Sequence, residues 1–186
     1  MTKTKLAVLF PGVGYHIDKP LMYHSKNLAI QAGYDTIAIE YSDLPTGIKG
    51  NAEKMKEAFL IACGQAKEQL SDIDFASYEK VVFISKSIGT AIGAYIDGEC
   101  GIGATHIYMT PVPQTFDMVR EGSGIVFHGL ADSWCDSDIA RARCEEKKLP
   151  LYTFENANHS IETGDAMHDL NSLVFIMEKI KEVLGD

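Results

Sequence analysis

The sequence predicts an α/β protein with a doubly wound, mostly parallel sheet of about six strands and helices on both faces. Two observations support this prediction. Short apolar runs recur along the chain and are continuous rather than alternating, as expected for strands that helices cover on both faces. Amphipathic segments separate these runs without a break in composition, which favours a single domain over residues 1–186.

The expected strands are short apolar runs spread along the whole chain. They lie at 6–10, 36–41, 81–84, 106–109, 125–127 and 151–154. In open α/β sheets, ligands bind beyond the carboxyl ends of the strands. We therefore look for functional residues directly after each run.

The two clearest amphipathic segments predict long helices. In residues 51–70, apolar side chains recur every three to four positions: Met55, Phe59, Ala62, Ala66 and Leu70. The C-terminal segment repeats this pattern, and Asp165 is its expected N-cap. Its stripe, which we interpret as core, consists of Met167, Leu170, Val174, Met177, Ile180 and Leu184.

Composition excludes several classes of partner. The chain has 26 acidic and 17 basic residues, and its net charge of −9 repels nucleic acid and anionic membrane surfaces. The apolar run at 6–10 is too short for a signal peptide, and no apolar stretch approaches the ~20 residues that span a bilayer. The four cysteines, Cys63, Cys100, Cys135 and Cys144, show no metal-ligand spacing. We expect thiols in a reducing compartment, a cytoplasmic location and no metal.

Four strand ends carry residues suited to nucleophilic catalysis. The segments are PGVGYH after the first run, SKSIG after the third, HGLAD after the fifth and ENANHS after the sixth. A serine nucleophile needs a base to take its proton, and the base needs a carboxylate to fix its tautomer. Ser87, His159 and Asp132 fit these three roles.

The order Ser87, Asp132, His159 resembles that of the α/β-hydrolases, and the whole chain resembles a small member of that family without a cap domain. Ser85-Lys86-Ser87-Ile88-Gly89 is similar to the G-x-S-x-G nucleophile turn, although Ser85 replaces the first glycine. HGLAD resembles the family's H-G-x-x-D turn, and NANHS resembles its G-x-x-H-S segment. The resemblance implies an oxyanion hole formed by the N–H groups of Val13 and Ile88, with Gly14 as the alternative donor.

Other interpretations compete at several positions. Ser87 could simply cap the helix that begins near Ile88, and Asp136 and Asp138 compete with Asp132, although they suit the start of the next helix. The resemblance makes His128 structural rather than catalytic. The GVG segment lacks the third glycine of a dinucleotide-binding loop because Ile17 occupies that position, and SKSIG lacks the phosphate-binding P-loop pattern.

These residues predict a serine hydrolase that cleaves a small ester or thioester without a cofactor. The short segment between the fourth and fifth runs leaves little room for a lid, so we expect an open pocket. Its expected walls are Gly14, Tyr15, Met109, Pro111 and Trp134. An acyltransferase with the same triad and a non-catalytic binding protein remain alternatives, a peptidase is not excluded, and the oligomeric state is open.

Overall fold

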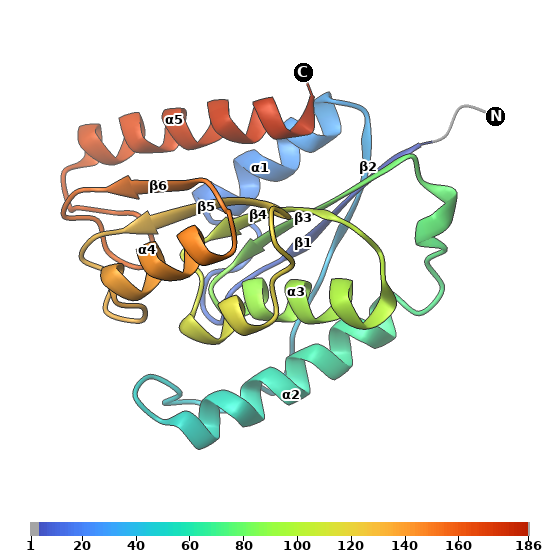
Figure 1. The fold of residues 1–186 in the computed structure, drawn as a ribbon, viewed down its shortest axis with the longest axis horizontal. Helices are drawn as coiled ribbons and strands as arrows, with labels where there is room; N and C mark the ends of the chain where they lie inside the picture. Colours follow the sequence, from blue (N-terminus) through green and yellow to red (C-terminus); the bar gives the residue numbers. More distant parts are fainter. Residues whose placement is uncertain (1–3, 186) are drawn as a thin grey trace.

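The computed structural model describes residues 4–185 and contains a six-stranded, all-parallel sheet (Figure 1). Its strands are β1 (Lys5–Phe10), β2 (Tyr34–Ala38), β3 (Lys80–Lys86), β4 (Thr105–Met109), β5 (Gly124–Gly129) and β6 (Leu151–Phe154). The strand order is β2-β1-β3-β4-β5-β6. The predicted fold class is confirmed, five of the six expected runs lie within strands, and the second overlaps a strand. The second strand differs most, because it begins two residues earlier than predicted and ends at Ala38.

Helices cover both faces of the sheet, as Figure 1 shows. They are α1 (Pro20–Gln31), α2 (Ala52–Gln69), α3 (Ile88–Cys100), α4 (Ser137–Glu146) and α5 (Ala166–Leu184), with short 3-10 helices η1 (Phe75–Ser77) and η2 (Pro113–Asp117). Helices α1 and α5 pack on one face, whereas α2, α3 and α4 pack on the other. Alternate residues of β1 therefore enter different cores, with Leu9 facing α1 and Val8 facing the α2–α3 layer.

The C-terminal helix buries only the second half of the predicted stripe, Met177, Ile180 and Leu184. Asp165 caps α5 by accepting hydrogen bonds from two backbone N–H groups, as expected. Met167, Leu170 and Val174, however, are exposed. The face that packs on the sheet and α1 consists of Leu173, Ile176, Met177, Ile180, Val183 and Leu184. Apolar residues of α5 occupy much of its circumference, so the sequence pattern alone is compatible with more than one buried stripe.

The sheet changes direction between β1 and β3. From β1 the chain moves outward to β2, returns to β3 on the other side of β1, and then proceeds to β6. The turn after β1 and the turn after β3 therefore leave the same edge of the sheet side by side. Such a switch point is the usual ligand site of an open parallel sheet. Within residues 4–185, no helix is both long enough and apolar enough to cross a membrane.

Candidate active site

Ser87 lies on a strained turn between β3 and α3. Its φ of 56° and ψ of −125° place a non-glycine residue in a sparsely populated backbone region, at a cost of about 1–3 kcal/mol. Although Ser87 occupies the N-cap position of α3, its side chain makes no capping hydrogen bond. The geometry of this turn therefore does not support the capping interpretation.

Close backbone contacts explain the small residues around Ser87. A Cβ atom on Gly89 would lie 2.2 Å from the carbonyl oxygen of Phe10, so only glycine fits where α3 crosses the end of β1. A Cβ atom on Gly12 would lie 3.0 Å from the Cβ of Ser87. The first turn thus packs directly against the serine.

Ser85 is accommodated within the sheet. It is fully buried in β3, and its hydroxyl donates a hydrogen bond to the Ile107 carbonyl on β4, at 3.1 Å. The buried hydroxyl therefore has a partner, which removes the usual cost of burying a polar group. A serine at this position is compatible with the sharp turn that follows.

Three side chains from different loops form a continuous hydrogen-bonded chain. Ser87 Oγ lies 2.8 Å from His159 Nε2, and His159 Nδ1 lies 2.8 Å from Asp132 Oδ2. The other carboxylate oxygen of Asp132 accepts a hydrogen bond from the Trp134 backbone N–H, at 2.8 Å. Because an ionised carboxylate only accepts hydrogen bonds, Nδ1 carries the proton of a neutral His159 and Nε2 can accept from the serine.

Two backbone N–H groups near the serine are free to bind an anion. The turn after β1 is closed by reciprocal backbone hydrogen bonds between Gly12 and Tyr15, both at 3.2 Å. Within residues 4–185, neither Val13 N–H nor Ile88 N–H donates to a protein acceptor. Ile88 is the first residue of α3, where helical N–H groups lack intrahelical partners.

The arrangement of these elements is found in solved hydrolase structures. Matching structures include a serine hydrolase without a lid from Xanthomonas campestris, with TM-score 0.64 and 10% identity, covering 100% of this chain and 85% of that one. An α-β serine hydrolase homologue from Coxiella burnetii matches with TM-score 0.68 and 13% identity, covering 98% and 85%. The chain has a lidless α/β-hydrolase fold. Est1E from Butyrivibrio proteoclasticus with bound ferulic acid matches with TM-score 0.68 and 13% identity, covering 98% and 88%. No protein-family model and no curated protein sequence matches.

In this α/β-hydrolase fold, burial and the hydrogen bond between His159 and Asp132 shift the pKa of each residue in opposite directions. Burial lowers the pKa of His159 below its usual value, the hydrogen bond to Asp132 opposes this, and the charge of Lys86 lowers the pKa further. Burial alone would raise the pKa of Asp132, but the hydrogen bond and charge of His159 outweigh it and the net pKa is lowered. Near neutral pH, therefore, His159 is a free base beside an ionised carboxylate.

Lys86 is a site residue that sequence reasoning missed. Its side chain is only 1% exposed, and its Nζ donates a 2.8 Å hydrogen bond to the backbone carbonyl of His159. The hydroxyl of Thr110 donates to the same carbonyl at 2.9 Å. Nζ also lies 4.9 Å from the centre of the Tyr15 ring. A lysine between two serines, at the end of a strand whose centre is apolar, was the available signal.

The competing acidic and histidine residues have other partners. Asp136 caps α4 by accepting a hydrogen bond from the Asp138 N–H at 2.8 Å. His128 is fully buried, with Nε2 lying 3.0 Å from the Ser137 hydroxyl and Nδ1 lying 4.0 Å from Asp132. The hydrogen-bonded chain therefore includes only Asp132 and His159 from these candidates.

The residues expected to form the walls of one pocket border different hollows in the structure. Trp134 stacks on His159 with 5.3 Å between ring centres and borders a hollow next to α2. Gly14 and Val13 line a hollow of about 470 Å³ beside the first turn. Tyr15 instead borders a cavity between α1 and α5.

The remaining expected wall residues are less accessible. Met109 is a correction to the predicted pocket, because it is fully buried in the core of the α1–α5 face. It lies on β4, an inner strand of the sheet, and its side chain belongs to the core between the sheet and the helices α1 and α5. Pro111 is also buried. Within the described residues, no cluster of His, Cys, Asp or Glu is arranged to hold a metal ion.

Proposed function

We propose that this protein is a serine hydrolase that cleaves a small ester or thioester through an acyl-enzyme. The observation that supports it most directly is the chain of 2.8 Å contacts joining Ser87, His159 and Asp132. An alcohol becomes a useful nucleophile when a positioned base accepts its proton. A serine on a strained turn beside such a base fits this chemistry.

In the proposed reaction, Ser87 Oγ attacks the carbonyl carbon while His159 Nε2 takes the hydroxyl proton. Asp132 holds the ring and stabilises the imidazolium that forms. The N–H groups of Val13 and Ile88 bind the developing oxyanion, a contribution of about 3–4 kcal/mol per donor. The carbon–oxygen or carbon–sulfur bond then breaks, and His159 returns the proton to the leaving group.

Water completes the proposed cycle. His159 removes a proton from water, the resulting hydroxide attacks the acyl carbon, and the bond to Ser87 Oγ breaks with return of the proton to the serine. The connection between β4 and β5 contains only η2 and short loops, so the serine is not enclosed by a lid domain. This openness favours small substrates over an ester that needs a deep enclosed tunnel.

A fluorophosphonate probe tests the proposal directly. We expect the folded protein to form a covalent adduct on Ser87, located by peptide mass spectrometry. Ser87→Ala should abolish the adduct, and His159→Ala should slow its formation by at least about a thousandfold because the serine loses its base. Absence of an adduct on protein with a native circular dichroism spectrum would contradict the proposal and favour a binding role.

A further inference from the structure

An apolar groove runs along helix α2, beside the start of helix α3. Eight of the ten residues that line its inner part are apolar, and its volume is about 360 Å³. Met55, Phe59 and Leu60 of α2 form one wall, and Ile88 and Ala91 of α3 form the other. Ile88 directly follows Ser87, so one wall begins at the proposed nucleophile.

A second hollow joins the groove at the N-terminal end of α2. It has a volume of about 300 Å³, and it shares Ala52, Met55, Val112 and Gln114 with the first. Its far wall includes Trp134, whose ring stacks on His159. The two hollows therefore reach the neighbours of both proposed catalytic groups: Ile88, which follows Ser87, and Trp134, which stacks on His159.

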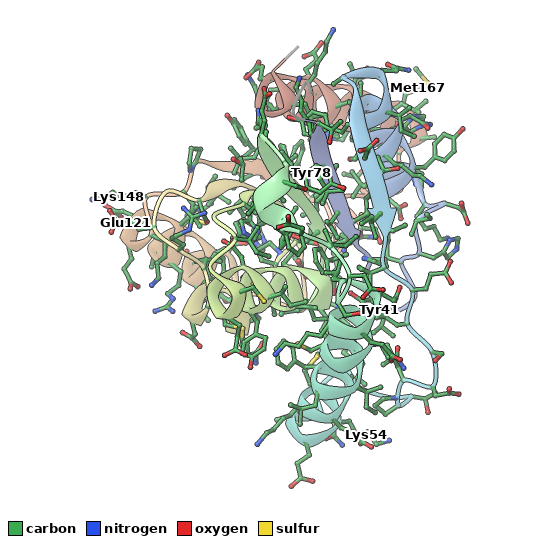
Figure 2. All side chains as sticks on the ribbon, turned by 90° about the vertical axis from the view of Figure 1, so that its right-hand side faces the viewer. Tyr41, Lys54, Tyr78, Glu121, Lys148 and Met167 are labelled. Carbon is green, nitrogen blue, oxygen red and sulfur yellow. The ribbon has the colours of Figure 1, made fainter. Side chains whose placement is uncertain are left out.

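The packing of α2 explains why the groove is open. Its fully buried residues, Ala58, Ala62, Cys63 and Ala66, all lie beyond the first turn and a half of the helix. Ala52 and Lys56 are exposed, and Leu60 is 60% exposed. Figure 2 shows Lys54 at the end of α2 that stands away from the sheet. The first half of α2 therefore leaves apolar side chains uncovered beside α3.

We propose that this groove binds an unbranched apolar chain of the ester substrate, which makes the substrate class a medium-chain alkyl ester or thioester. This inference rests on the proposed hydrolase function. From Ala52 to Leu60 the helix advances about 12 Å, roughly the length of an extended chain of eight to ten carbons. Covering apolar groove walls with an alkyl chain is favourable, whereas a polar substituent would lose its hydration there.

Two ester series test the proposal and identify which side of the ester carries the chain. One varies the acyl group from p-nitrophenyl acetate to p-nitrophenyl tetradecanoate, and the other varies the alcohol from methyl acetate to tetradecyl acetate. We expect kcat/KM to rise in one series by up to about fourfold per buried methylene and to level off near eight to ten carbons. A flat profile in both series, with acetate esters still hydrolysed, would overturn the groove proposal and leave the hydrolase function intact.

Matched tryptophan variants test whether the preference for long chains arises in this groove. Ala52→Trp places an indole where the two hollows meet, and it should lower the ratio of long-chain to acetate kcat/KM at least about tenfold. Glu57→Trp, on an exposed part of the same helix that borders neither hollow, should leave the ratio as in the original protein. Equal ratios in the two variants would overturn the assignment of the chain to this groove.

A binding measurement keeps the test independent of catalysis. On Ser87→Ala, titration calorimetry should show octanamide binding at least about tenfold more tightly than butanamide, and Ala52→Trp added to this variant should remove the difference. Equal affinities for the two amides would overturn the groove proposal whether or not any ester is hydrolysed. If octanamide binds as expected but no ester is cleaved, the groove stands and the proposed reaction fails.

Discussion

The amino group of Lys86 is buried away from water. Burial lowers its pKa to about 7, while the negative charges of Asp132 and Glu162 oppose that shift. The cost of burying Nζ is offset by its hydrogen bond to the His159 carbonyl and by its contact with the face of the Tyr15 ring. The same ammonium group fixes the backbone of the proposed base and adds positive charge near its ring. We therefore regard Lys86 as a positioning residue for His159.

Removing this charge should change the pH dependence of hydrolysis. The charged or titratable groups that act on His159 are Asp132, Lys86, Lys49 and His128. Because Lys86 is protonated below pH 7, its loss in Lys86→Met makes the imidazolium easier to form. The acid limb of the kcat/KM profile, expected below pH 6.5 in the original protein, should then move to higher pH. We also expect kcat/KM to fall about tenfold to a hundredfold because the His159 backbone loses a support.

Lys86→Arg serves as the matched variant because it retains the charge. Its acid limb should stay closer to that of the original protein, even if packing of the larger group lowers kcat. An acid limb in Lys86→Met that coincides with the original one would contradict the electrostatic role. A fall in kcat alone would indicate only a structural contribution.

The residues of the candidate site differ in how far the sequence predicts them. Ser87, Asp132 and His159 follow strand ends in a characteristic order, so their proximity was predictable. The role of Lys86 depends on three-dimensional burial, which a single sequence does not show. Met109 was misplaced for the converse reason, because a residue near a strand end can still point into the core.

At the level of elements, the contact between α3 and the end of β1 decides how the serine is presented. Gly89 allows the helix to approach the Phe10 carbonyl so closely that any side chain would collide with the backbone. A collision with backbone is harder to relieve than one with the end of a flexible side chain. The position of Ser87 therefore depends on the absence of a side chain at Gly89.

Two glycine-to-alanine substitutions in α3 test this dependence. Gly89→Ala should lower the free energy of unfolding by about 3 kcal/mol, at the upper end of the usual overpacking cost. Gly98→Ala, on the exposed side of the same helix with nothing within 4 Å of the new Cβ, should raise it by up to about 1 kcal/mol through better helix propensity. Urea unfolding measures both. Equal midpoints for the two variants would refute the close contact.

The strands and helices differ in how well sequence patterns predict them. All six strands were predictable because continuous apolar runs mark buried parallel strands. The first half of the α5 stripe was not, because Met167, Leu170 and Val174 repeat with the same spacing as the residues that actually pack. Which stripe is buried depends on how the helix is rotated against α1 and the sheet, and that rotation is set by tertiary packing.

At the scale of the whole molecule, buried histidines connect folding to pH. Burial lowers the pKa of His106 and His128, as it does that of His159. Each folded-state pKa is therefore below the unfolded value of about 6.5. Such groups contribute stability that is present above pH 6.5 and lost as pH falls through the folded-state pKa. Asp97 and Asp132, whose net pKa values are also lowered, extend the loss below about pH 4.

Calorimetry between pH 8 and pH 4 should show this loss as a falling Tm. We expect Tm to drop by several degrees between pH 7 and pH 5. The relief of charge repulsion as the net charge of −9 decreases acts in the opposite direction. His106→Gln, which cannot be protonated, therefore serves as the internal comparison. Its Tm should decline less steeply over the same interval, and a slope identical to that of the original protein would argue against the histidine contribution.

The three hydrogen-bonded side chains come from elements that are made at very different times during protein synthesis. Ser87 follows the third strand, Asp132 follows the fifth, and His159 follows the sixth, 72 residues after the serine. A growing chain therefore exposes Ser87 long before its partner base has been translated. In the proposed mechanism, the serine of a nascent chain lacks its base until His159 has been made and β6 has paired with β5, so that reactivity would begin only when the sheet is complete.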